Sequence, residues 1–173
     1  MPVLTVKLNY RTANFMALKQ YNFKISKKMA IFIIIAVFLT SLDRFLKFIA
    51  INNFFDTPQK IIVNFLNLKF VKNYNIAFSL PVNGLILNFI IILIIIGLLY
   101  SLIYLIKKQN YKQSTYLIFI IFGAISNLLD RLEFGFVIDY FDLKYFTVFN
   151  LADMMIVGGV IGILFGIIKS KKY

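Results

Sequence analysis

Long apolar stretches separated by short polar segments dominate this chain. A helix needs about 20 largely apolar residues to cross the hydrocarbon core of a bilayer. Four stretches meet this requirement, at about Ala30–Ala50, Asn83–Ile106, Thr115–Leu132 and Leu151–Ile168. No internal repeat or low-complexity linker separates them. We therefore expect one α-helical integral membrane domain with four transmembrane helices.

The polar segments that follow the first and third stretches carry other patterns. Phe65–Phe70 alternates apolar and polar residues as a strand does, and the stretch continues through Val71–Asn75 to Ala77 and Phe78. Residues 133–148 contain six aromatic side chains, which suits a membrane interface. We predict a small β-sheet and an interfacial segment on the outer face. The alternative for the aromatic residues is that they only anchor the helix ends.

Glycine recurs at every fourth position of the last stretch, at Gly158, Gly162 and Gly166. Residues at this spacing share one helix face, and small residues there allow a neighbouring helix to approach closely. We interpret this face as a packing surface within the chain rather than a dimer contact, and we expect a monomer.

The composition excludes several classes of protein and several types of catalytic residue. Hydrophobic residues make up 61% of the 173 positions and charged residues 15%, whereas a soluble domain has close to half and about a quarter. This excludes a disordered chain, a secreted disulfide scaffold and an ordinary cytosolic enzyme. The sequence has no cysteine and no histidine, which excludes thiol nucleophiles, Ser-His-Asp triads and metals held by these residues. We expect no cofactor and no metal.

The net charge of +12 follows the arrangement of the segments. Twelve of the 19 basic residues lie in residues 1–29, 107–114 and 169–173, which contain no acidic residue. Excess Lys and Arg mark cytoplasmic segments, so both termini and the middle turn are expected in the cytoplasm. The charge therefore gives no support to nucleic-acid binding. The predicted organisation is a basic cytoplasmic arm at 1–29, a four-span domain at 30–168 and a basic cytoplasmic tail at 169–173.

The N-terminal arm allows two other interpretations. A cleaved signal peptide fits poorly, because Asp43 and Arg44 follow the first apolar stretch with no small-x-small cleavage site before them. Initiation at Met16 would shorten the arm. As written, its composition suits a basic segment near anionic lipid.

Four of the seven acidic residues gather at one level in this topology: Asp43, Asp130, Asp139 and Asp153 are all expected near the outer interface. Charges within spans are costly and mark ion pairs or functional sites. Asp43 and Lys47 are four residues apart with the acid first, which favours an ion pair on one helix face. We interpret this pair as support for the structure or the substrate path.

Asp130 and Arg131 are neighbours, so their side chains diverge on a helix and do not pair with each other. Arg131 then needs another acceptor, either a carboxylate or loop carbonyl groups. With Asn127, these two residues are expected to form a polar cluster that holds the outer helix ends together.

Asp139 and Asp153 have different local settings. Asn150 is a good N-cap and Asp153 is the third residue after it, so capping alone is one explanation of Asp153. Asp139 is flanked by apolar and aromatic residues with no basic residue within four positions. Two carboxylates that share a site can hydrolyse a peptide without histidine, because repulsion keeps one protonated while the other activates water. A helix N-terminus would favour Asp153 as the ionised member.

Five short blocks occur in order along the chain: Asp43–Lys47 (D-x-x-x-K), Asn73–Ser79 (N-x-G-x-A-F-S), Asn127–Arg131 (G-N-x-x-D-R), Val137–Phe141 (V-V-D-F-I) and Phe149–Asp153 (F-N-x-A-D). Together with four spans, they resemble the lipoprotein signal peptidases (signal peptidase II), a family of four-span membrane aspartic peptidases. The resemblance covers about residues 30–168. Two positions depart from the family pattern, because Asn75 and Ser126 stand where glycine is usual.

The resemblance implies an aspartic endopeptidase of the bacterial cytoplasmic (inner) membrane. Its substrates would be prolipoproteins, cleaved just before a cysteine that carries diacylglycerol, at a site near the outer surface and in contact with membrane lipid. Asp139 and Asp153 would be the catalytic pair. The supporting and substrate-binding residues would be Asp43, Lys47, Asn73, Asn127, Asp130, Arg131 and Asn150.

Three other classes of protein are considered. A small transporter or channel subunit would use Asp43, Lys47 and Arg131 along an ion path, but its charges would lie nearer the bilayer midplane, often at broken helices. A lipid-binding or assembly factor would need no paired acids. A Ser-Lys peptidase would need a serine and a lysine that pair at the outer level, and no convincing pair is present.

Overall fold

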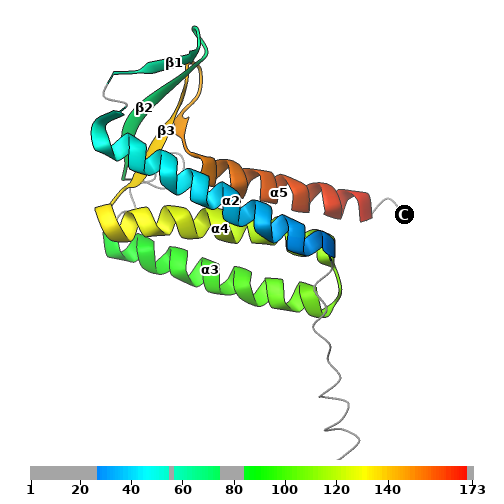
Figure 1. Cartoon of the computed structure of the whole chain (residues 1–173). Coiled ribbons are helices and arrows are strands. Elements are labelled where there is room, and N and C mark those ends of the chain that lie inside the picture. Colours follow the sequence, from blue (N-terminus) through cyan, green and yellow to red (C-terminus); the bar gives the residue numbers. More distant parts are fainter. Residues whose placement is uncertain (1–26, 55–56, 75–83, 171–173) are drawn as a thin grey trace, which may run out of the picture.

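Four long helices form the body of the protein, and the computed structural model describes residues 27–54, 57–74 and 84–170. The helices lie side by side (Figure 1). A short π-helical segment, η1 (Ala50–Phe54), continues the first of them. The bounds of the long helices are α2 Lys27–Ile49, α3 Gly84–Lys107, α4 Tyr111–Phe134 and α5 Leu151–Ser170.

The positions of the helices agree with most of the predicted transmembrane stretches. Three helical segments, Lys27–Asn52, Gly84–Lys107 and Leu151–Lys169, are long and apolar enough to cross a membrane. They coincide with three of the four predicted spans. The fourth predicted span, Thr115–Leu132, lies within α4, and its passage through the membrane stays a prediction.

The central position of α4 explains why it is more polar than the other helices. It contacts α2, α3 and α5, so much of its surface faces protein. Its buried residues include Ser114, Ser126, Asn127 and Asp130. Polar groups are tolerated at such positions when they find partners inside the bundle.

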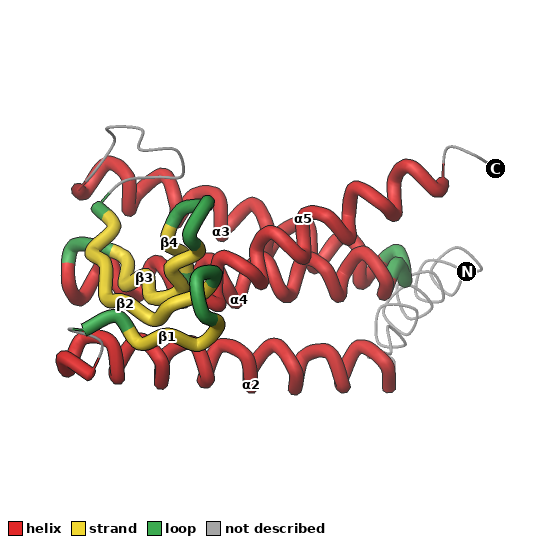
Figure 2. Tube along the Cα trace, turned by 90° about the horizontal axis from the view of Figure 1, so that it is seen from above, coloured by secondary structure: helices red, strands yellow, loops and turns green. Residues whose placement is uncertain are grey.

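Four short strands form an antiparallel sheet in the order β1–β2–β3–β4, with bounds β1 Gln59–Ile62, β2 Leu66–Asn73, β3 Val137–Leu143 and β4 Val148–Phe149. The sheet lies at one end of the bundle, where α2 and α4 end and α5 begins (Figures 1 and 2). In the same views, α2 begins and α5 ends at the opposite end of the bundle.

The predicted strand at Phe65–Phe70 is confirmed as most of β2. The segment expected at the interface forms β3 and β4, which join the same sheet; its membership of the sheet was not predicted. The expected continuation through Asn75 to Ala77 and Phe78 lies outside the described residues. The same holds for most of the N-terminal arm and for the end of the basic tail.

The side chains of β3 alternate between the two faces of the sheet, and one of these faces packs against the helical part of the protein. Phe136, Ile138 and Tyr140 share one face and form an apolar cluster with Ala50 of η1. Asp139 lies between them in the sequence and therefore points to the other face. Its side chain is 1% exposed, so the strand holds a carboxylate in a buried position.

Close helix packing depends on one of the predicted glycines and on two others. A methyl group at Gly123 of α4 would lie 2.5 Å from the carbonyl oxygen of Ala152, and one at Gly159 of α5 would lie 2.7 Å from the carbonyl oxygen of Tyr116. Of the predicted face, Gly162 is tight against the Tyr116 ring, whereas Gly158 borders open space. The prediction of a glycine contact within the chain is right, but its residues are only partly so.

We expect Gly123→Ala to lower the free energy of unfolding by about 1–3 kcal/mol, because the added methyl group forces α4 and α5 apart. Gly158→Ala is the matched control, since nothing lies within 4 Å of its added methyl group. Thermal unfolding of both variants in the same detergent tests this. Equal midpoints for the two variants would contradict the proposed helix contact.

Candidate active site

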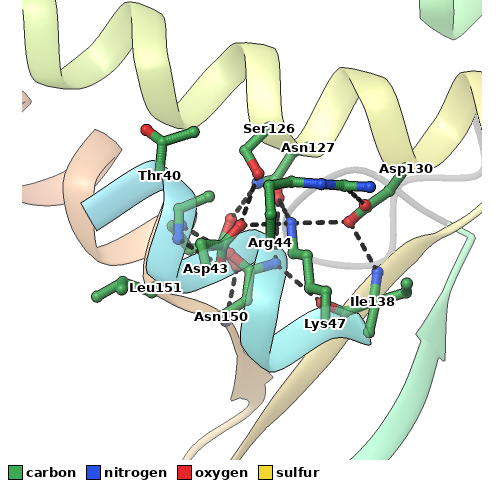
Figure 3. Close-up of polar contacts among 12 residues, drawn as sticks. Thr40, Asp43, Arg44, Lys47, Ser126, Asn127, Asp130, Ile138, Asn150 and Leu151 are labelled. Atoms are coloured by element: carbon green, nitrogen blue, oxygen red, sulfur yellow. Dashed lines mark hydrogen bonds and ion pairs between the residues drawn. The ribbon is translucent and has the colours of Figure 1, made fainter. Parts of the chain in front are cut away.

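The Lys47 ammonium group lies at the centre of a buried polar cluster (Figure 3). Its Nζ is 2.9 Å from Asp43 Oδ2 and 2.7 Å from Asp130 Oδ2, and it donates to Asn127 Oδ1 at 2.9 Å. An ammonium group has three N–H donors, so each one has an acceptor. The predicted pair of Asp43 and Lys47 is confirmed, and Asp130 joins it from α4.

Asp43 is fully buried and accepts hydrogen bonds from three elements besides its own helix. Ser126 Oγ donates to its Oδ2 at 2.6 Å, and Tyr140 Oη donates to its Oδ1 at 2.9 Å. The backbone N–H of Ala152 donates to Oδ1 at 3.2 Å. With Lys47, these donors connect α2 to α4, β3 and α5.

Asp130 binds residues of α2 and β3. Arg44 Nη1 forms an ion pair with its Oδ1, and the backbone N–H of Ile138 donates to its Oδ2 at 3.2 Å. Arg131 Nη1 donates to the carbonyl oxygen of Asn127, one turn earlier, at 3.5 Å. The prediction that Asp130 and Arg131 diverge agrees with these contacts.

Asn150 and Asp153 cap the first turn of α5 reciprocally. The N–H of Asp153 donates to Asn150 Oδ1 at 2.8 Å, and the N–H of Asn150 donates to Asp153 Oδ2 at 3.2 Å. The predicted N-cap is therefore confirmed. Asp153 Oδ1 also accepts from Asn127 Nδ2 at 2.7 Å. Capping alone does not explain Asp153, since its second oxygen faces this cluster.

Asp139 reaches the same cluster from the sheet. Asn73 Nδ2 donates to its Oδ2 at 2.8 Å, and Asn150 Nδ2 donates to its Oδ1 at 2.7 Å. Val71 pairs with Asp139 and Asn73 with Val137, so Asn73 and Asp139 are diagonal neighbours across β2 and β3. The sheet register thus brings an amide donor to this carboxylate.

Asn150 lies between the two carboxylates, because its side chain binds Asp139 and its backbone binds Asp153. Burial, and secondly the negative charge of Asp153, raise the pKa of Asp139 to about 7; the hydrogen bonds from Asn73 and Asn150 act in the opposite direction. Asp139 is buried and Asp153 is partly exposed. The site therefore contains two neighbouring carboxyl groups in different environments.

The residues expected in the site from the sequence come together at the sheet end of the bundle. They are Asp43, Lys47, Asn73, Asn127, Asp130, Arg131, Asp139, Asn150 and Asp153. Asn75, one of the two departures from the family pattern, lies outside the described residues. Within the described ranges, no group of three or more acidic, histidine or cysteine side chains is arranged to hold a metal ion.

Three contributors to the site were not identified from the sequence. Tyr140 was counted only among the aromatic residues of 133–148, Ser126 was noted only as a departure from the family pattern, and Arg44 was not assigned a partner. Their roles depend on contacts to Asp43 and Asp130 from other elements. The only local signal is that Tyr140 and Arg44 each stand beside an aspartate in the sequence.

The fold and the cluster define a helical membrane protein with two adjacent carboxyl groups at one end of its bundle. Comparison with known proteins identifies the class. Residues 15–169 match the model of a family described as signal peptidase (SPase) II. The chain belongs to the signal peptidase II family.

Relatives and solved structures agree with this assignment. A lipoprotein signal peptidase of Caldanaerobacter subterraneus subsp. tengcongensis is 38% identical over 75% of this chain and 90% of its own length. One from Enterococcus faecalis is 32% identical, over 85% and 93%. A structure described as a bacterial membrane enzyme, at 2.3 Å resolution, superposes with a TM-score of 0.71 at 28% identity, over 82% of this chain and 90% of that one.

We expect Lys47→Met to lower the free energy of unfolding by about 3–5 kcal/mol, because it leaves Asp43 and Asp130 buried without their shared cation. Lys69→Met on β2 is the control, since Lys69 is exposed. Thermal unfolding in detergent compares the two variants. A Lys47→Met protein as stable as the control would show that this ammonium group does not hold the cluster together.

Proposed function

We propose that the chain is an aspartic endopeptidase that removes signal peptides from diacylglyceryl-modified prolipoproteins and cleaves just before the lipidated cysteine. Membership of the signal peptidase II family supports the reaction class. The observation that carries the catalytic type is the pair of carboxyl groups, Asp139 and Asp153, bound to the same Asn150. No cofactor takes part in the proposed reaction.

The two carboxyl groups divide the work of general acid and general base. Asp139, with its pKa raised to about 7, carries the proton and donates a hydrogen bond to the scissile carbonyl oxygen. Asp153 lies in the first turn of α5, where the helix dipole favours its ionised form. It takes a proton from the water that attacks the carbonyl carbon, and it passes this proton to the leaving amine nitrogen as the peptide C–N bond breaks. Because the groups interact, the titration belongs to the pair.

The supporting residues bind the two carboxyl groups through amide side chains. Asn73 and Asn150 bind Asp139, whereas Asn127 binds Asp153 and Lys47. Lys47 and Arg44 together neutralise Asp43 and Asp130. We therefore assign Asp139 and Asp153 to catalysis. We assign positioning of the pair or of substrate to the others, Arg131 included.

The proposed topology has four spans, with α4 as the third, and both termini in the cytoplasm of a bacterial inner membrane. The basic residues Lys27, Lys28, Lys107 and Lys169 lie towards the end of the bundle opposite the sheet, as the positive-inside rule requires. The site then lies near the outer surface, in reach of lipid and of a lipid-modified substrate. The protein acts as a monomer.

An ion path through the bundle would need charged groups along its length. The acidic side chains of the cluster gather instead at the sheet end, where α2 and α4 end and α5 begins. This distribution favours a surface-proximal hydrolytic site over a transporter or channel subunit.

Asp139→Asn and Asp153→Asn are each expected to reduce cleavage at least about a thousandfold, because each removes one of two groups that act as a unit. The assay follows a diacylglyceryl-modified precursor in detergent. Asp142→Asn is the matched control, because Asp142 lies on the same strand as Asp139 and has no place in the proposed chemistry. Substantial cleavage by either dyad variant would refute the catalytic pair.

Activity is expected to fall as pH rises through about 7, because Asp139 then loses the proton that it must donate. Asn73→Ala removes a hydrogen bond that lowers the pKa of Asp139. This variant should move the fall in kcat/KM to higher pH. The measurement is kcat/KM across pH for the two proteins.

Asn67→Ala provides the control for the pH experiment, since Asn67 also lies on β2 but pairs with Asp142 rather than Asp139. Its profile should match that of the unmodified protein. A profile for Asn73→Ala that stays in place or moves to lower pH would contradict the role of Asp139 as the protonated member.

A further inference from the structure

We propose that Tyr140 is a positioning residue for the catalytic pair. Its hydroxyl group and the Asp43 carboxylate together hold the first turn of α5 and so set the place of Asp153. The inference rests on the proposed function for its catalytic consequence. The contact itself is independent of that function.

Two backbone N–H groups of α5 donate hydrogen bonds to side chains of two other elements, β3 and α2. The N–H of Leu151 donates to Tyr140 Oη at 3.0 Å, and the N–H of Ala152 donates to Asp43 Oδ1 at 3.2 Å. Tyr140 Oη in turn donates to the same Asp43 Oδ1 at 2.9 Å. One carboxylate oxygen and one hydroxyl group thus bind consecutive residues of the helix.

This arrangement differs from ordinary capping. The first N–H groups of a helix have no acceptor within it and are usually served by a nearby side chain or by water. In α5 the N–H of Asp153 follows that rule, since Asn150 serves it. The N–H groups of Leu151 and Ala152 are served from β3 and α2. Their acceptors therefore fix the helix start relative to the sheet and the first span.

The Tyr140 hydroxyl group is shielded from bulk solvent. The side chain is fully buried, so bulk water does not reach it. Burial, and secondly the charge of Asp43, raise the pKa of Tyr140, so the hydroxyl group stays protonated and donates to Asp43 while its oxygen accepts from Leu151. A phenylalanine at this position would leave the Leu151 N–H without that acceptor.

A change in the contact between Tyr140 and Leu151 affects Asp153 because the two α5 residues share the first turn of the helix. Asp153 is two residues after Leu151, and its Oδ1 depends on a 2.7 Å hydrogen bond from Asn127. A shift of the first turn moves this carboxylate relative to Asp139 and to the substrate carbonyl group. Misplacement of a reacting group costs rate rather than affinity when the altered residue does not touch substrate.

Tyr140→Phe is expected to lower kcat about tenfold and leave KM within about twofold, as removal of one hydrogen bond to a charged group predicts. Tyr145→Phe, at a residue that is 84% exposed, should leave both constants unchanged. Thermal unfolding of each variant checks that it is folded at the assay temperature. A folded Tyr140→Phe protein with unchanged kcat would overturn the positioning role.

Amide hydrogen exchange of the Leu151–Asp153 segment tests the contact without using activity. Tyr140→Phe should increase the exchange rate there at least about fivefold, since Leu151 loses its acceptor. Ser126→Ala is the comparison, because it also removes a hydroxyl donor to Asp43 but from α4. It should leave the exchange of this segment unchanged. Equal protection in Tyr140→Phe and the unmodified protein would overturn the inference.

The two experiments separate the inference from the proposed function. Faster exchange in Tyr140→Phe, together with active Asp139→Asn protein, would retain the α5 contact and refute the catalytic pair. Unchanged exchange and unchanged kcat, together with inactive Asp139→Asn protein, would retain the pair and refute the role of Tyr140.

Discussion

The buried ammonium group of Lys47 is the interaction on which the rest of the structure depends. It brings Asp43 of its own helix and Asp130 and Asn127 of α4 to one point. Burying one cation with two carboxylates is stable only when hydrogen bonds satisfy the remaining charge. Here Ser126, Arg44 and backbone N–H groups supply them. The helices therefore cannot slide without exposing an unpaired charge.

The same requirement explains the contrast among the three fully buried aspartates. Asp43 and Asp130 have cationic partners, so their charge stabilises the bundle. Asp139 accepts hydrogen bonds from the amide groups of Asn73 and Asn150, and burial raises its pKa. The ion pairs thus account for the charges of Asp43 and Asp130, whereas Asp139 changes its protonation near neutral pH. A carboxyl group with a raised pKa is typical of sites that use a carboxylic acid as a proton donor.

The sequence predicted features whose causes are local. Spans follow from apolar stretches, the pair of Asp43 and Lys47 from a four-residue spacing, and the N-cap at Asn150 from the residues that follow it. Contacts between elements that are far apart in the sequence were harder to predict. Nothing near Tyr140 indicates that its hydroxyl group meets α2 and α5, and nothing near Gly123 indicates its approach to α5. The gathering of the aspartates was foreseen because topology alone brings their segments to one end.

The lengths of the helices have a consequence for depth in the bilayer. The 24 residues of α3 span about 36 Å at 1.5 Å per residue, whereas the hydrocarbon core is about 30 Å thick. Lys47 lies in the last turn of α2 and Asp153 in the first turn of α5. The 20 residues of α5 span about 30 Å by the same measure, so in the proposed topology Lys47 and Asp153 lie at the boundary of the hydrocarbon core. Water is available at that boundary, so the proposed hydrolysis needs no channel through the bundle.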